Sequence, residues 1–317
     1  MSKQGKGKKT RSMRGRDFLS VDDFSSREIR EVFKLAAAMK AHPRRYRTSL
    51  DGRIMALIFE KQSLRTRTTF TVGITQLGGS ALTLTPADIS LGKRESVFDV
   101  AKNLERMVDG IMIRTFGHDI AKSMAAHAGV PVINGLTDFE HPCQALADFF
   151  TIAECGKKLK HSKIVYVGDG NNVTHSLALT AAKLGATFVV ATPESYRPDA
   201  ALMERATVLA GENGATITWT SDPAEAVRDA DVVYTDTWTS MGQEQEAAAR
   251  RVAFAPFQVN MGLFSHAAPD AIFMHCLPAH RGEEVTDEVI DSPNSVVFQQ
   301  AENRLHVQKA IMYRLLR

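Results

Sequence analysis

The sequence predicts an α/β protein of two similar-sized domains, each a parallel sheet flanked by helices. Short apolar runs that suit buried strands alternate with segments of helical periodicity along most of the chain. The length of 317 residues suits about two domains. Polar clusters directly follow several apolar runs, and ligands of parallel sheets bind at the carboxyl ends of strands. These observations together favour two α/β units with a ligand site at their strand ends.

We expect a disordered basic tail in residues 1–16, a first domain in 17–150 and a second in 151–317. The tail holds seven Lys and Arg residues and no acid, so removing it changes the net charge from +3 to −4. The basic isoelectric point of 8.7 is therefore mainly a property of the tail, and we expect no nucleic-acid partner. No apolar run reaches the ~18 residues of a membrane span. Three cysteines without metal-ligand spacing favour a reducing, cytoplasmic location and no metal.

In the first domain, the apolar positions Ile29, Val32 and Phe33 predict a helix over 25–39. A helix with Phe70, Ile74 and Leu77 on one face should end before Gly78. The polar, turn-rich stretch 85–95 is expected to be a loop. We expect strands at 54–59, 80–84, 110–115 and 130–134, and further helices at 96–107, 120–128 and 138 to about 154.

The second domain repeats the alternation. We expect strands at 164–167, 187–191, 215–219, 232–235 and 272–275, and helices at 176–184, 198–213, 223–228, 244–259 and 285–291. The long helix 244–259 should bend or end at Pro256. Residues 295–317 are expected to begin extended and to end as an amphipathic helix from about residue 303, which packs back on the first domain.

The stretch Ser63-Leu64-Arg65-Thr66-Arg67 lies between the first strand and the next helix. Free N–H groups and the positive end of the helix dipole favour an anion there, and Arg forks match phosphate oxygens. We interpret this stretch as a phosphate cradle. The alternative is a capped surface helix with solvated arginines.

His141-Pro142-Cys143-Gln144 stands at another helix start. A neutral imidazole and a carboxamide can together donate to a carbonyl oxygen and accept from an amide, which suits a planar O=C–NH2 group. Without a ligand, the same residues would form an ordinary helix cap.

Three polar stretches follow strands of the second half. The first, residues 168–172, resembles a dinucleotide-binding turn. However, Val173 replaces the last glycine of that pattern and no acidic residue stands at the end of the next strand, which weakens the interpretation as an NAD site. In the second, Asp236 and nearby hydroxyls suit an ammonium-bearing ligand or simply hold a loop. In the third, His275 and Cys276 should point to opposite faces, which favours a binding role for Cys276 over a covalent one.

Six ordered motifs, SLRTR, MIRT, HPCQ, GDGNN, DTWTSMG and HCLPAHRGEE, resemble those of ornithine carbamoyltransferases over residues 17–317. The resemblance implies an active site in the cleft between two domains, no cofactor or metal, and a homotrimer or a multiple of trimers. It implies transfer of a carbamoyl group from carbamoyl phosphate to the δ-amine of L-ornithine, in arginine metabolism. The motifs of the first half would bind carbamoyl phosphate, and Arg65, Arg114 and His141 among them would be catalytic. The residues that the resemblance implies for carbamoyl phosphate binding are Ser63, Leu64, Arg65, Thr66, Arg114, His141, Gln144, Arg304 and Ser90.

The second half of the motifs would bind ornithine through Asn172, Asp236, Ser240, Met241, Cys276 and Leu277, with Cys276 also expected to contribute to catalysis. Two residues depart from the family pattern. Leu64 replaces a common Thr, although its N–H still suits phosphate. Ser90 stands where a Gln commonly reaches carbamoyl phosphate from a neighbouring subunit, and Lys93 is the candidate substitute.

Three alternative functions stay open. One is a carbamoyltransferase for another amine, such as putrescine or N-acetylornithine, although Asp236 and Ser240 favour a free α-amino acid head group. Another is a non-catalytic binding protein of the same fold, against which Arg65, Arg114, His141 and Gln144 argue together. The third is an NAD oxidoreductase, which should be retained on a nucleotide column. The sequence leaves open whether the reaction runs in the anabolic or the catabolic direction.

Overall fold

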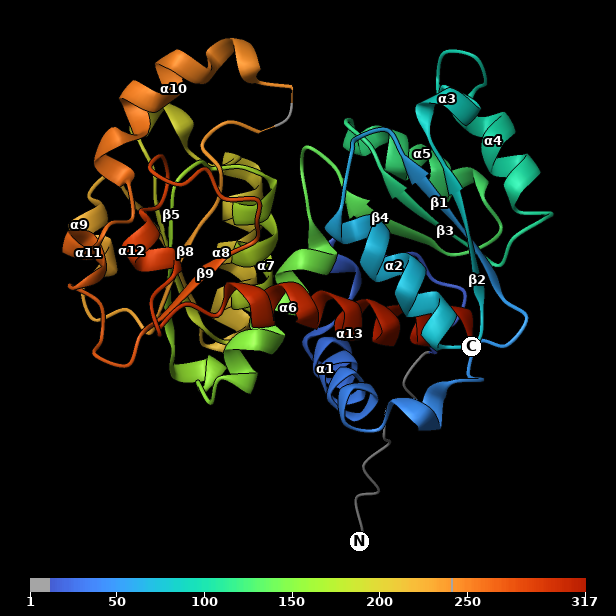
Figure 1. Ribbon diagram of the computed structural model, residues 1–317, viewed down its shortest axis with the longest axis horizontal. Coiled ribbons are helices and arrows are strands. Elements are labelled where there is room, and N and C mark those ends of the chain that lie inside the picture. The colour runs from blue at the N-terminus through green and yellow to red at the C-terminus, as the bar shows by residue number, and fades with distance from the viewer. Residues whose placement is uncertain (1–11, 241) are drawn as a thin grey trace, which may run out of the picture.

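The computed structural model describes residues 12–240 and 242–317, and it confirms two α/β domains, each built on a parallel sheet (Figure 1). The first sheet has the strand order β2-β1-β3-β4 and the second has the order β7-β6-β5-β8-β9. Every pairing within the two sheets is parallel. The strands are β1 Ile54–Phe59, β2 Ser80–Leu84, β3 Gly110–Arg114, β4 Val132–Leu136, β5 Lys163–Val167, β6 Thr187–Ala191, β7 Thr216–Thr220, β8 Val232–Thr235 and β9 Ile272–His275.

Helices flank both sheets, as expected for parallel strands joined by crossovers (Figure 1). In the first domain they are α1 Ser26–Ala41, α2 Arg65–Gln76, α3 Pro86–Ile89, α4 Val97–Leu104, α5 His118–His127 and α6 Pro142–Glu154. In the second domain they are α7 Asn172–Leu184, α8 Ala200–Asn213, α9 Pro223–Val227, α10 Ala247–Phe254, α11 Met261–Phe264, α12 Asp287–Ile290 and α13 Val297–Leu316. No helix in the described ranges is both long enough and apolar enough to cross a membrane.

Each sheet has a switch point at which the chain reverses its direction of strand addition. In the first sheet it lies between β1 and β3, and in the second between β5 and β8. The crevice outside such a point is the usual ligand site in an open α/β sheet. The motif at residues 63–67 follows β1, and Arg114 is the last residue of β3. Asn172 follows β5, and Asp236 follows β8.

The last helix, α13, joins the two domains. It begins just after the second sheet and runs across to pack on α6, α1 and α2 (Figure 1). Its approach to α2 is close because residue 73 is glycine: a Cβ there would lie 2.8 Å from Met312 Cε. The segment does begin extended, with Ser295 bridged to Phe273, but the expected helix start near residue 303 is wrong because α13 begins at Val297.

Three other local expectations are corrected. Residues 85–95 include the one-turn helix α3, because Thr85 and Asp88 form a capping box. Helix α7 begins at Asn172, four residues before the predicted start, because the Asn171 side chain accepts from two N–H groups of its first turn. The expected disorder of residues 12–16 is also wrong, since Met13 is buried and the Gly15 N–H donates to the Leu315 carbonyl at 3.0 Å. Residues 1–11 of the expected tail lie outside the described residues.

Candidate functional site

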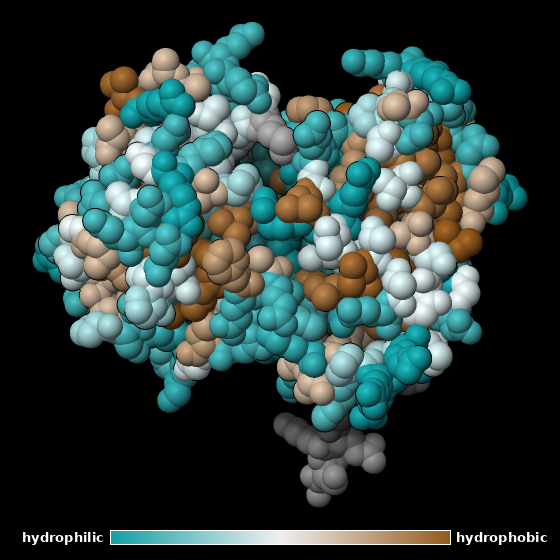
Figure 2. Space-filling model, viewed as in Figure 1, coloured by the Kyte–Doolittle hydropathy of each residue, from teal (hydrophilic) through white to brown (hydrophobic). Residues whose placement is uncertain are grey.

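A cavity of about 900 Å³ lies between the two domains, where the carboxyl ends of both sheets face each other. Figure 2 shows it as a hollow between the two lobes of the molecule. Its lining comes mainly from the segments that follow β1, β4, β5, β6, β8 and β9, together with Arg114 at the end of β3 and Arg304 from α13. The cavity therefore gathers residues that lie far apart in the sequence.

The start of α2 forms one wall of the cavity. The Ser63 hydroxyl accepts a hydrogen bond from the Thr66 N–H at 3.1 Å and so fixes the first turn of the helix. Leu64 and Arg65 line the cavity, whereas Arg67 is turned toward Phe59, with its guanidinium carbon 5.4 Å from the centre of that ring. The hydroxyl and the helix start suit an anion, as the sequence predicted.

Three guanidinium groups converge behind this helix start: Arg65, Arg114 and Arg304. The Thr66 hydroxyl accepts from Arg304 Nη2 at 2.7 Å and from Arg114 Nη1 at 3.4 Å. None of the three forms an ion pair with any residue that the structure describes. Burial, followed by repulsion from Arg304 and Arg65, lowers the pKa of Arg114 to about 10. Three cations without a counter-ion make this end of the cavity a strong anion site.

His141 and Gln144 lie at the start of α6 and line the same end of the cavity. The His141 N–H donates to the Ser176 hydroxyl at 2.9 Å, which ties the start of α6 to α7. Burial and the three nearby arginines lower the pKa of His141 well below its ordinary value, so the ring is neutral at pH 7. His141 Nδ1 and Gln144 Oε1 are buried without a hydrogen-bond partner among the described residues. A ligand with polar groups would satisfy both atoms.

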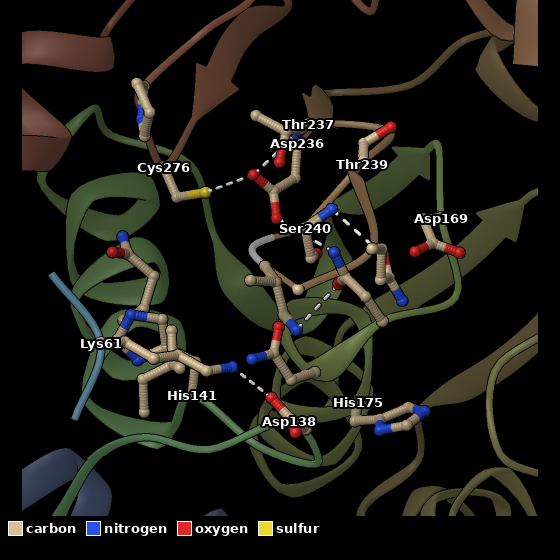
Figure 3. Close-up of a pocket in the computed structure, with 18 of the residues that line it drawn as sticks. Lys61, Asp138, His141, Asp169, His175, Asp236, Thr237, Thr239, Ser240 and Cys276 are labelled. Atoms are coloured by element: carbon tan, nitrogen blue, oxygen red, sulfur yellow. Dashed lines mark hydrogen bonds and ion pairs between the residues drawn. The ribbon is translucent and has the colours of Figure 1, made fainter. Parts of the chain in front are cut away.

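The opposite wall carries a carboxylate and a thiol. Asp236 follows β8, and its Oδ1 accepts from the Cys276 thiol at 3.0 Å, while its Oδ2 accepts from Asn171 Nδ2 at 3.1 Å (Figure 3). Burial and the negative charge of Asp236 raise the pKa of Cys276 well above its ordinary value. A protonated thiol that donates to a carboxylate suits a binding role rather than nucleophilic attack.

Asp236, His275 and Cys276 also present potential metal-ligand atoms within 4.8 Å of one another. Both ring nitrogens of His275 are engaged, however. The Leu277 N–H donates to Nδ1 at 2.8 Å, and Nε2 lies 3.1 Å from Glu284 Oε1. The ring has no free lone pair for a cation, so this set does not fit a metal site.

Most of the residues singled out from the sequence meet in this one cavity. Thr66 lies behind the lining, where its hydroxyl holds Arg304 and Arg114. Ser90 lies outside the cavity of this chain, with φ +41° and its hydroxyl donating to the Pro86 carbonyl. Met241 lies outside the described residues. The predicted residues that line the cavity are Ser63, Leu64, Arg65, Arg114, His141, Gln144, Asn172, Asp236, Ser240, Cys276, Leu277 and Arg304.

An ion pair between a buried lysine and an exposed aspartate also lies at the cavity and was not predicted from the sequence. The Lys61 ammonium pairs with the Asp138 carboxylate (Figure 3). It also lies over the Phe116 ring, 4.3 Å from the ring centre. Only 5% of the Lys61 side chain is exposed. The sequence signal that could have indicated this role is the position of Lys61, two residues after β1 and two residues before the predicted phosphate cradle. The sequence predicted that Asn171 faces a polar ligand at the sheet edge, whereas the structure shows that it orients Asp236 and caps α7.

Comparison with known protein families assigns both halves of the chain. Residues 16–154 match the family model described as aspartate/ornithine carbamoyltransferase, carbamoyl-P binding domain. Residues 160–315 match the model described as aspartate/ornithine carbamoyltransferase, Asp/Orn binding domain. The two models together cover nearly all of the chain.

Similar proteins of full length carry related names. The chain is 56% identical over 306 residues to an ornithine carbamoyltransferase of Thermococcus kodakarensis, covering 95% of this chain and 96% of that protein. It is 53% identical over 306 residues to an anabolic ornithine carbamoyltransferase of Pyrococcus furiosus, covering 95% and 96%. A solved structure of ornithine carbamoyltransferase from Pyrococcus furiosus superposes with a TM-score of 0.94 at 52% identity, covering 97% of this chain and 99% of that chain. A solved structure of the anabolic ornithine carbamoyltransferase from Campylobacter jejuni superposes with a TM-score of 0.90 at 40% identity. The match covers 94% of this chain and 97% of that chain.

Proposed function

The chain belongs to the aspartate/ornithine carbamoyltransferase family, and we propose that it transfers the carbamoyl group of carbamoyl phosphate to the δ-amine of L-ornithine. The products are L-citrulline and phosphate. The observation that carries this proposal is the pairing, within one cavity, of an unneutralised arginine cluster with the Asp236–Cys276 pair. The first suits a phosphate and the second suits an ammonium group. The similarity to anabolic relatives favours the direction of citrulline synthesis, in arginine biosynthesis.

Carbamoyl phosphate would occupy the end of the cavity nearest α2. Its phosphate would accept from Ser63, Arg65, Thr66 and the Leu64 N–H, and its carbonyl oxygen from Arg114 and His141. The buried acceptor Gln144 Oε1 would take the carbamoyl N–H. Arg304 would add positive charge from α13. This pose gives a partner to the unpaired polar atoms at this end of the cavity.

Ornithine would lie against the opposite wall, with its α-ammonium group at Asp236 and its carboxylate near Asn172. Ser240, Cys276, Leu277 and, outside the described residues, Met241 complete the expected contacts. Arg65 lies close enough to Asp236 and Cys276 for their charges to affect its pKa, which is lowered mainly by burial. The two substrates would therefore meet within one enclosed space.

The neutral δ-amine attacks the carbonyl carbon, and Arg114 with the neutral His141 donates to the oxyanion that forms. The bond from that carbon to the phosphate oxygen then breaks, and the proton lost by the amine leaves with the phosphate. Arg65 offsets the charge of the departing group. Exclusion of water by closure of the cleft would protect the hydrolysable carbamoyl phosphate.

We propose a cytoplasmic homotrimer, or a multiple of trimers, in which a neighbouring copy completes each site. The first domain exposes apolar side chains that a second copy could cover, including Leu82 at 45%, Phe98 at 50% and Met107 at 66%. Figure 2 shows apolar residues gathered over this domain. Ser90, or Lys93 beside it, would reach carbamoyl phosphate from the neighbouring copy. Three free cysteines are consistent with a reducing compartment.

The test is citrulline formation by the purified protein from carbamoyl phosphate and ornithine, with parallel reactions on putrescine, N-acetylornithine and aspartate. We expect turnover with ornithine alone. Turnover with another amine would mean that the Asp236 wall recognises a different head group. Failure with all four, in protein that still binds phosphate, would indicate a non-catalytic binding protein.

A further inference from the structure

Asp148 is a fully buried carboxyl group for which the proposed reaction has no direct use. It lies on α6 one turn after Gln144 and is completely enclosed. Its Oδ1 accepts from Gln144 Nε2 and from Gln300 Nε2, each at 2.8 Å, and its Oδ2 accepts from the Tyr234 hydroxyl at 3.1 Å. It forms no ion pair with a described residue. Burial raises the pKa of Asp148 to about 7, although its three hydrogen bonds and the charge of Arg304 lower it. Burying an acid in this way is costly, so its presence calls for a function.

The carboxylate decides which way the Gln144 amide faces. In its ionised form the carboxylate can only accept hydrogen bonds, and a proton on Oδ2 would still leave Oδ1 an acceptor. Gln144 therefore turns its NH2 group toward Oδ1 of Asp148. Its carbonyl oxygen Oε1 then points away, and this atom is buried without a partner at the edge of the cavity. If the amide turned over, the cavity would receive a donor instead of an acceptor. The neighbouring arginines already supply donors, so the acceptor is the scarcer group here.

The same carboxylate is anchored from the second domain. Tyr234 lies on β8 two residues before Asp236. Gln300 lies on α13, donates also to the Tyr234 hydroxyl at 3.1 Å, and accepts from the His275 N–H at 3.0 Å. Asp148 is thus held by two rigid elements of the second domain while it holds one residue of the first. Such a support shell fixes a ligand-binding side chain to within small tolerances.

We propose that Asp148 is a positioning residue, which orients the Gln144 amide so that its oxygen accepts from the carbamoyl NH2 group. This inference rests on the proposed function, because it assumes that carbamoyl phosphate is the ligand at Gln144. It assigns Asp148 no contact with either substrate. Its effect should therefore be confined to the carbamoyl half of that ligand and should leave the phosphate half unchanged.

The experiment compares two affinities in each variant: the KM for carbamoyl phosphate and the inhibition constant for inorganic phosphate. Asp148→Leu replaces the acceptor by an apolar group of similar size. We expect the KM for carbamoyl phosphate to rise by about tenfold, which corresponds to the loss of one oriented buried hydrogen bond. The inhibition constant for phosphate should change by less than about twofold. Equal loss of both affinities would mean a general structural role and would overturn the proposal.

Thr151→Val is the matched control. Thr151 is buried one turn further along α6 and accepts from Asn303 Nδ2 on α13 at 2.9 Å, so its loss also removes a polar link between α6 and α13. That link does not touch Gln144. We expect the control to lower the melting temperature without changing the ratio of the two affinities. A change in that ratio like that of Asp148→Leu would also overturn the proposal.

A double-mutant cycle tests whether Asp148 acts through Gln144. If it does, the Asp148→Leu and Gln144→Leu effects on carbamoyl phosphate should not add. Additive effects would contradict the proposal. If Asp148→Leu does not fold, the exchange of Gln144→Glu with Asp148→Asn restores a carboxylate–amide pair and an acceptor facing the cavity. This double variant should then be more active than Gln144→Glu alone, and an equal or lower activity would count against the proposal.

The wild-type protein separates this inference from the proposed function. If it forms no citrulline, the proposed function fails. If it forms citrulline and the Asp148 variants keep the wild-type ratio of affinities, only the positioning role of Asp148 fails.

Discussion

The Cys276 thiol donates its hydrogen to Oδ1 of Asp236 across 3.0 Å, and so two strand ends of the second sheet are joined at the wall of the cavity. The Thr237 N–H also donates to that oxygen at 2.8 Å, and Asn171 donates to the other one. The carboxylate is therefore held in one orientation, facing the space in which an amino group would bind. The thiol helps to orient this carboxylate while remaining protonated.

The Cys276–Asp236 contact predicts the effect of removing the thiol. Cys276→Ala should raise the KM for ornithine by about tenfold, which corresponds to one hydrogen bond to a charged group. Turnover at saturating ornithine should persist, because the thiol forms no covalent bond in the proposed reaction. Steady-state kinetics measure both quantities. Complete loss of turnover in a folded variant would instead indicate a nucleophilic cysteine.

The arginine cluster predicts an unusual stability effect. Arg114→Met should raise the melting temperature of the ligand-free protein by a few degrees, because it removes one of three cations that repel each other, two of which are buried. A gain of about 1–2 kcal/mol in the free energy of unfolding would produce such a shift. The same variant should lose the stabilisation that millimolar phosphate gives the wild type. Thermal denaturation with and without phosphate measures both effects. Destabilisation without phosphate, or an unchanged phosphate effect, would contradict the cluster's proposed role.

Glu140 predicts a pH-dependent contribution to stability. Burial raises the pKa of Glu140 to about 7 in the folded chain, although its carboxylate accepts from the Val21 N–H at 3.1 Å and the Ser176 hydroxyl at 3.2 Å. Between its ordinary pKa near 4.5 and pH 7 the folded state keeps a proton that the unfolded state releases. Its contribution to stability is therefore present at acid pH and is lost as the pH rises through 7.

The measurement compares the wild type with Glu140→Gln, whose side chain does not titrate. The unfolding free energy of the wild type minus that of the variant should fall by about 3 kcal/mol between pH 4.5 and pH 7.5. Taking the difference cancels the contributions of histidines such as His175, whose pKa burial lowers and which oppose this trend. Urea denaturation gives both free energies. A constant or rising difference would show that Glu140 is already ionised in the folded protein at acid pH.

The reaction should also depend on the ionisation of ornithine. The attacking amine must be neutral, so the rate at saturating substrates should rise between pH 7 and about pH 8.5. His141 should not contribute to this rise, because its pKa lies well below its ordinary value. A pH–rate profile for citrulline formation measures the effect. A rate that falls over this interval would contradict attack by the neutral amine.

The alternation of short strand-like runs with helical segments was sufficient to locate the nine strands of the described residues. The central strands are apolar on both faces, whereas the edge strands β2 and β7 are partly exposed and more polar. Element ends were harder to predict. The start of α7 depends on the Asn171 cap, which is a local signal that periodicity alone does not detect. The start of α13 was hidden because Gln300 and Asn303, although polar, are buried. Their hydrogen bonds to Asp148 and Thr151 make that burial tolerable, and these partners lie about 150 residues away.

The sequence by itself determined the fold class, the alternation of strands and helices, and the residue types that follow the strand ends. These depend on short-range patterns of polarity and on a topological rule for parallel sheets. Only the tertiary structure decided that Lys61 pairs with Asp138, that three arginines gather without an ion-pair partner, and that Tyr234 and Gln300 hold Asp148 beneath the cavity. These contacts arise where α6, α13 and both sheets meet. Their energies depend on burial and on distances between segments that are remote in the sequence, which no local pattern encodes.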